Sequence, residues 1–165
     1  MLTVSPSREM EILQRYKANP PVRVRDAIRE LGIAYIEQPM HDDQSGFFAR
    51  QGGTYVIGVN QSDGIQRRRF TAAHELGHCV LHRDLLRDGE HFDRLYDKAA
   101  ASNPPGPFSP RHEVQANQFA ADFLMPAKVV SQVFNRNPSI SHLAEQFGVS
   151  RAAAEIRLKN LGLIK

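Results

Sequence analysis

The chain has 165 residues, of which 41% are apolar and 24% are charged, and its formal net charge is +3 with a pI near 9.2. This composition is ordinary for a globular protein of one domain with at most a small appended module, and it argues against wholesale disorder. The small basic excess does not by itself indicate a nucleic-acid-binding surface.

Two short helices are expected before the first strand. Residues 7–19 carry apolar side chains three apart and stop at Pro20-Pro21, where the prolines end a helix. Residues 22–31 place apolar side chains on one helical face, and Gly32 is a natural C-terminal stop. The N-terminal part of the chain is therefore predicted to be helical.

A small antiparallel sheet is expected next. Residues 33–39 have a β-like composition, and residues 46–50 and 54–60 have the character of two strands joined by a hairpin at Gln51-Gly52-Gly53. Residues 66–81 then have helical periodicity without prolines, which predicts a buried helix.

The segment 83–110 is expected to be mostly loop, because it holds four prolines and two glycines and few apolar residues. Loops of this length in a compact domain tend to be lids or binding segments. We expect this one to border a substrate cleft, with His91, Tyr96 and His112 in it or beside it. None of the three is assigned a catalytic role.

The rest of the chain is expected to be helical in two parts. Residues 111–125 form one helix that ends at Pro126, and residues 127–134 form another. We place a boundary at 135–138, so that residues 1–134 form the main domain. Residues 139–165 then form a helix-turn-helix-like segment, hinged at Gly148-Val149-Ser150, that is packed on this domain or appended to it.

The sequence also bears on the compartment. The N-terminus lacks the pattern of a secretion signal, and no apolar run approaches the roughly 18 residues that span a bilayer. Cys79 is the only cysteine, so no intrachain disulfide can form and a metal site must use mainly nitrogen and oxygen ligands. We expect a soluble cytoplasmic protein with no membrane partner.

The stretch His74-Glu75-Leu76-Gly77-His78 carries the clearest chemical pattern. Two histidines four apart lie on one helical face about 6 Å apart along the axis, close enough to bind one tetrahedral zinc. Zinc lowers the pKa of a bound water to about 7, and a carboxylate beside it can accept the proton. The alternative is a helix that holds these residues by chance. The opposite face of this helix is apolar, and Gly77 permits close approach of another backbone. Both observations favour a zinc site with Glu75 as general base.

A third protein ligand is needed, with the fourth position left for water. His82 is rejected as a ligand, because His74 and His82 are about 12 Å apart along the helix axis; a hydrogen-bonding or packing role behind the ligands is favoured. Glu113, on the next long helix, is the preferred ligand, and Asn117, four residues on, can hydrogen-bond a zinc histidine and fix its tautomer. A solvated glutamate in a first helical turn is the alternative for Glu113.

Two histidines remain fallback ligands. These are His91 and His112, and each is a less favoured candidate ligand than Glu113. Cys79 follows His78 directly but points about 100° around the helix from it, so buried packing is favoured over metal binding.

Two stretches of the sequence together resemble one known family. Residues 73–82 are AHELGHCVLH, and residues 113–126 are EVQANQFAADFLMP. They resemble the ImmA/IrrE family of metallo-endopeptidases, and the resemblance extends over about residues 27–126. Residues 140–164 also resemble the helix-turn-helix-like segment that often follows this peptidase core. The proline-rich residues 103–110 depart from the family pattern.

The resemblance implies an α+β fold, with a mostly helical, gluzincin-like zincin core, a small antiparallel β-sheet and the C-terminal helix-turn-helix-like segment. It implies one Zn²⁺ per chain bound by His74, His78 and Glu113, with Glu75 as general base. It also implies a protein substrate: a helix-turn-helix transcriptional repressor encoded nearby, whose cleavage relieves repression.

A DNA-binding regulator or partner-binding protein with a structural or vestigial zinc site is the competing hypothesis. From residue 136 onward the chain has five basic and two acidic residues, so DNA contact is possible. The second helix, however, offers few asparagines or glutamines at its N-terminal end, where base edges are usually contacted, and a docking or packing role is favoured. Glu75 separates the hypotheses, because a closed structural site has no use for a carboxylate beside an open position.

Overall fold

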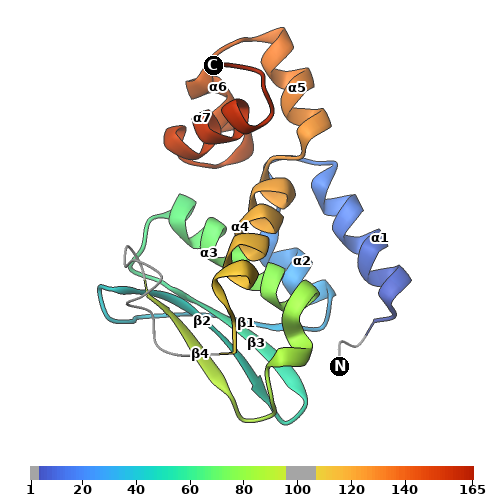
Figure 1. The fold of residues 1–165 in the computed structure, drawn as a ribbon, viewed down its shortest axis with the longest axis vertical. Coiled ribbons are helices and arrows are strands. Elements are labelled where there is room, and N and C mark those ends of the chain that lie inside the picture. The colour runs from blue at the N-terminus through green and yellow to red at the C-terminus, as the bar shows by residue number, and fades with distance from the viewer. Residues whose placement is uncertain (1–3, 96–106) are drawn as a thin grey trace.

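The computed structural model describes residues 4–95 and 107–165 (Figure 1). The sheet lies at one end of the molecule, helices α1–α4 lie above it, and α5–α7 form the other end. The elements in chain order are α1 (Pro6–Lys17), α2 (Val24–Glu30), β1 (Ala34–Gln38), β2 (Gln44–Gln51), β3 (Thr54–Asn60), α3 (Ile65–His82), the 3₁₀ turn η1 (Arg83–Leu85), β4 (His91–Leu95), α4 (Pro110–Leu124), α5 (Ala127–Arg136), α6 (Ile140–Phe147) and α7 (Arg151–Asn160).

The fold is α+β, as expected, but the sheet is mixed and not purely antiparallel. Its strand order is β1-β3-β2-β4, with β1 parallel to β3 and the other two pairings antiparallel. The predicted hairpin of β2 and β3 is present. Every residue of β3 after Thr54 is buried. A strand so thoroughly buried is stabilised by neighbours on both sides, and β1 occupies the side that β2 leaves open.

The prediction that segment 83–110 is mostly loop missed one strand. Residues 91–95 form β4, which pairs with β2 and places Phe92 opposite Phe48. A strand of five residues has too few positions for a period of two to stand out, and the hydrogen bonds of the β2 edge stabilise it in the folded protein.

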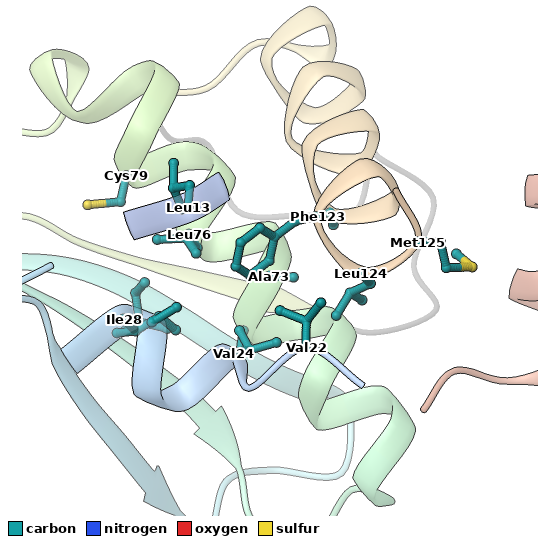
Figure 2. Close-up of a cluster of buried hydrophobic side chains, with 14 of the residues drawn as sticks. Leu13, Val22, Val24, Ile28, Ala73, Leu76, Cys79, Phe123, Leu124 and Met125 are labelled. Carbon is teal, nitrogen blue, oxygen red and sulfur yellow. The ribbon is translucent and has the colours of Figure 1, made fainter. Parts of the chain in front are cut away.

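The packing of α3 against α4 forms the centre of the core. Figure 2 shows Ala73 and Leu76 of α3 beside Phe123 of α4, with Ile28 of α2 nearby. Gly77 lies at the closest approach: a Cβ there would be 3.1 Å from the Cβ of Phe119 and 3.2 Å from the Cα of Ala116, tighter than most real contacts. Glycine at 77 therefore lets the two helices approach closely, as the sequence suggested.

The C-terminal helices are joined to the core by Arg69 of α3. Its guanidinium donates hydrogen bonds to the carbonyl oxygens of Val22 (2.7 Å), Gly148 (3.0 Å) and Phe147 (3.2 Å). Gly148 ends α6 with a φ of 63°, which glycine adopts without strain, and a Cβ there would lie 3.0 Å from the Arg69 Nε. The buried side chains of α6 and α7 belong to the same apolar cluster as those of α1–α4. The division at residues 134 and 139 stays a prediction.

Replacement of Arg69 by alanine should destabilise the protein by about 2–4 kcal/mol, because three carbonyl groups lose a charged donor. Arg67→Ala is the matched control, since Arg67 forms a partly exposed ion pair with Asp63 and its loss should cost about 0.5 kcal/mol or less. Denaturant unfolding of both variants measures the difference. Equal midpoints for the two variants would contradict the role given to Arg69.

Candidate metal centre

Helices α3 and α4 bring three metal-binding side chains together. The Nε2 of His74 lies 3.1 Å from the Oε2 of Glu113, and the Nε2 of His78 lies 2.9 Å from the Oε1. The ligand atoms of the three residues all lie within 4.8 Å of one another. Ligands of a tetrahedral zinc with bonds of about 2.1 Å are about 3.4 Å apart, so small side-chain rotations suffice to bind one ion. The described residues hold no second group of three such ligands.

The tautomer of His74 is set by Asn117. The Nδ1 of His74 lies 2.7 Å from the Asn117 Oδ1, which can only accept a hydrogen bond. Nδ1 therefore carries a proton and donates it to Asn117, and Nε2 is the nitrogen that faces Glu113 and would bind a metal. This is the orientation that a metal-binding histidine usually takes from a neighbouring oxygen.

His78 is oriented by a longer chain of contacts. Its Nδ1 lies 3.0 Å from the Nδ1 of His82, and the Nε2 of His82 lies 2.7 Å from the Gln115 Oε1. His82 thus contacts the nitrogen of His78 that does not face Glu113, and it is not a member of the group of three possible ligands. The ring of Phe108 stacks on that of His78, with centroids 4.0 Å apart and planes 10° apart.

The electrostatics of the cluster fit a cation. Burial alone would raise the pKa of Glu113, but hydrogen bonds to His74 and His78, and then their charges, lower it far below its ordinary value. Glu113 is therefore ionised at neutral pH. Both histidines are 1% exposed, and a buried set of two imidazoles and a carboxylate is a ligand set that a cation would stabilise. The residues fit a divalent metal such as zinc.

The members of the cluster differ in their exposure to solvent. The side chain of Glu113 is 23% exposed, whereas those of His74 and His78 are buried. Glu75 is adjacent to His74 on α3 and is itself only 1% exposed. Glu113 is therefore the exposed member of the cluster, and His74, His78 and Glu75 are enclosed by protein.

The fallback ligands lie elsewhere. His91, in β4, stacks on Phe47 and pairs with Asp93 at 2.5 Å. His112 accepts a hydrogen bond at its Nδ1 from the Ser109 backbone N–H, so it caps the start of α4. Neither belongs to the cluster of three. Tyr96 lies outside the described residues.

Two contributors escaped the sequence analysis. Gln115 lies on α4 between Glu113 and Asn117, but it reaches the site only through His82, and no sequence spacing indicates such an indirect contact. Phe108 follows the proline-rich stretch in a segment expected to be loop, yet it is only 9% exposed. An aromatic residue among prolines was the available signal for burial there.

The two histidines and the glutamate form a cluster that is compatible with a metal site. The model of a peptidase family described as the IrrE N-terminal-like domain matches residues 28–159, and the chain belongs to this family. It is 29% identical over 154 residues to the "uncharacterized immunity region protein 2" of Bacillus phage phi105, a match that covers 93% of this chain and 87% of the phage protein.

The fold is similar to that of a solved structure described as a Mycobacterium tuberculosis transcriptional regulator. The TM-score is 0.62 and the identity is 17%, with 93% of this chain covered. This chain spans about half (47%) of the length of that protein. None of the described helices is long and apolar enough to cross a membrane.

Cys79 belongs to the buried apolar core and is not a member of the ligand cluster (Figure 2 labels it among the core side chains). It is fully buried, and burial raises the pKa of its thiol to about 12. A thiol reagent at pH 8 should therefore leave the native protein unmodified on the time scale on which it labels one thiol per unfolded chain, because the thiolate is the reactive form. Rapid labelling of the native protein would show that Cys79 is accessible.

Proposed function

We propose that this protein is a zinc-dependent endopeptidase that cleaves a protein substrate, a helix-turn-helix transcriptional repressor. The cluster of His74, His78 and Glu113 carries the proposal, because it brings three possible metal ligands together, and Glu75 directly follows His74 on α3. Membership of a peptidase family supports the same activity. We place the reaction in the cytoplasm.

The roles of the side chains follow from their positions. Zinc, when bound by the three ligands, polarises the peptide carbonyl and lowers the pKa of water. Glu75 accepts a proton from the water whose oxygen attacks the carbonyl carbon, and it returns that proton to the leaving amine as the C–N bond breaks. Asn117 and His82 hold the imidazoles of His74 and His78 so that each directs its Nε2 to the metal position.

A polypeptide substrate fits the surface next to the site. Asn117 also lines a cleft of about 610 Å³ between α4 and α7, together with Val114 and Ile156. These two apolar side chains are more than half exposed. An open cleft with exposed apolar walls suits an extended or helical segment of another protein.

The choice of a repressor as substrate is supported by one relative. The phage protein is named for an immunity region, which points to a regulatory setting. The C-terminal helices are better suited to contact with this substrate than to contact with DNA. In α7, Arg157 donates to the Met125 carbonyl oxygen at 2.9 Å, Lys159 pairs with Glu155, and Arg151 donates to the Ser141 hydroxyl, so all three of its basic side chains have partners.

The purified protein should bind about one zinc per chain. His74→Ala should abolish this stoichiometry, and Glu113→Ala should weaken zinc affinity by at least about 100-fold, since each removes one of three ligands. Affinity should also fall as the pH is lowered, because protons compete with the metal for its ligands. Metal analysis and chelator competition measure these effects. His91→Ala is the control and should retain zinc; full stoichiometry in His74→Ala would refute the ligand assignment.

Glu75→Gln tests the chemical step, because it preserves shape and removes the base. Zinc content should be retained, and the turnover rate on the repressor encoded next to this gene should fall about 100- to 10,000-fold without a comparable change in substrate affinity. Glu11→Gln, on an exposed part of α1, is the matched control and should cleave at the wild-type rate. Equal rates for Glu75→Gln and wild type would remove the catalytic role and favour a regulator with a structural zinc site.

A further inference from the structure

A pocket rich in arginine lies where α2, β1 and the start of α3 meet. Its volume is about 330 Å³. The charged side chains that line it are four arginines and two acids, namely Arg23, Arg25, Arg68, Arg69, Asp26 and Glu37, and we call it the arginine pocket. Four guanidinium groups and two carboxylates leave the lining with a net charge of +2 at neutral pH.

The two acids neutralise the arginines only loosely. The Nη1 of Arg23 lies 3.4 Å from the Oδ2 of Asp26. The Nη1 of Arg68 lies 3.4 Å from the Oε2 of Glu37, whose Oε1 accepts a hydrogen bond from the Tyr35 hydroxyl at 2.9 Å. Charge-assisted hydrogen bonds between such groups are usually about 2.7–2.9 Å long. Both contacts are longer than this, so the two guanidinium groups keep donor capacity for another acceptor.

The other two arginines have no carboxylate partner among the described residues. Arg25 is exposed and forms no ion pair there. Arg69 donates only to the main-chain carbonyl oxygens of Val22, Phe147 and Gly148, which carry no net charge. Burial lowers the pKa of Arg69, as expected for a cation that is partly removed from water. An anion in the arginine pocket would therefore offset charge that the protein itself leaves unmatched.

Arg68 also has an unsatisfied donor. Its Nε is buried and has no hydrogen-bond partner, and a buried N–H without an acceptor is unfavourable. The Nε and Nη groups of one guanidinium form a planar fork that suits two oxygen atoms of a single anion. The side chain is 24% exposed, so it borders solvent, and a turn of the guanidinium would present this fork to an oxyanion in the pocket.

We propose that the arginine pocket binds the phosphate group of a small molecule. A phosphomonoester carries about −1.5 to −2 charges at pH 7 and three acceptor oxygens, which match the net charge of the lining and its several donors. A carboxylate offers one charge and two oxygens. The volume lies at the lower end of the range of about 300–1,000 Å³ for small-molecule sites, whereas duplex DNA is bound along an extended basic surface. The pocket contains none of the three possible metal ligands, so the proposal does not depend on peptidase activity.

An NMR titration of the full chain with inorganic phosphate tests the proposal, with the ionic strength held constant by sodium chloride. The wild type should bind phosphate saturably. Arg25→Gln and Arg68→Gln should each weaken binding about 10-fold, because each removes a charged donor. Arg87→Gln is the matched control and should bind as the wild type does, since the Arg87 side chain is 91% exposed and lies outside the pocket. Thermal unfolding checks that each variant is folded, and the exposed position of Arg25 keeps the test valid if Arg68→Gln is not.

Two further ligands separate this site from the alternatives. Acetate at the same ionic strength should bind at least about 10-fold more weakly than phosphate, because it has fewer charges and acceptors. Phosphate affinity that is unchanged in both Arg25→Gln and Arg68→Gln would overturn the proposal and place any bound phosphate elsewhere, such as on a metal ion. Equal affinities for acetate and phosphate would also overturn it. If a DNA duplex bound and lost affinity in these two variants while free phosphate did not bind, the surface would be assigned to nucleic acid instead.

Discussion

The meeting of the Glu113 carboxylate with His74 and His78 is the contact on which the rest of the site depends, because its members come from two helices. The histidines lie one turn apart on α3 and need only that helix to be formed. Glu113 is correctly placed only while α4 lies close against α3, and Gly77 at their closest approach permits this. The apolar contacts beneath, such as Phe123 against Ala73, hold the helices at that separation (Figure 2). Core packing and the geometry of the metal site are therefore coupled, because a shift of α4 would move the Glu113 carboxylate relative to the two histidines.

Burial of two imidazoles and an ionised carboxylate is unfavourable unless each polar atom is matched. On the outer side of the cluster, Asn117 and the contacts of His82 with His78 and Gln115 supply hydrogen bonds. On the inner side, the three ligands face one another around the position that a metal would take. An ion that binds only the folded protein also stabilises it by mass action, so metal occupancy and folding are linked in the proposed enzyme.

The sequence allowed the ligands to be predicted more fully than their supports. The spacing of His74 and His78 follows from helical geometry, and the structure brings Glu113 to them. Asn117 could be placed because it lies one turn from Glu113 on the same face. Gln115 could not, since its contact passes through a residue of another helix. The strand β4 was missed for a related reason: its pairing with β2 joins segments 40 residues apart and leaves no local pattern. Interactions within one element can thus be predicted from spacing, and interactions between elements depend on how those elements pack.

The contact between Arg69 and the C-terminal helices involves main-chain oxygen atoms only. Such an attachment recognises the shape of the turn at Gly148 and is indifferent to the side chains that α6 and α7 carry on their outer surfaces. Those surfaces are free to diverge while the segment stays joined to the core in the same orientation. Substitutions on those surfaces would therefore leave both the attachment and the buried ligand cluster in place.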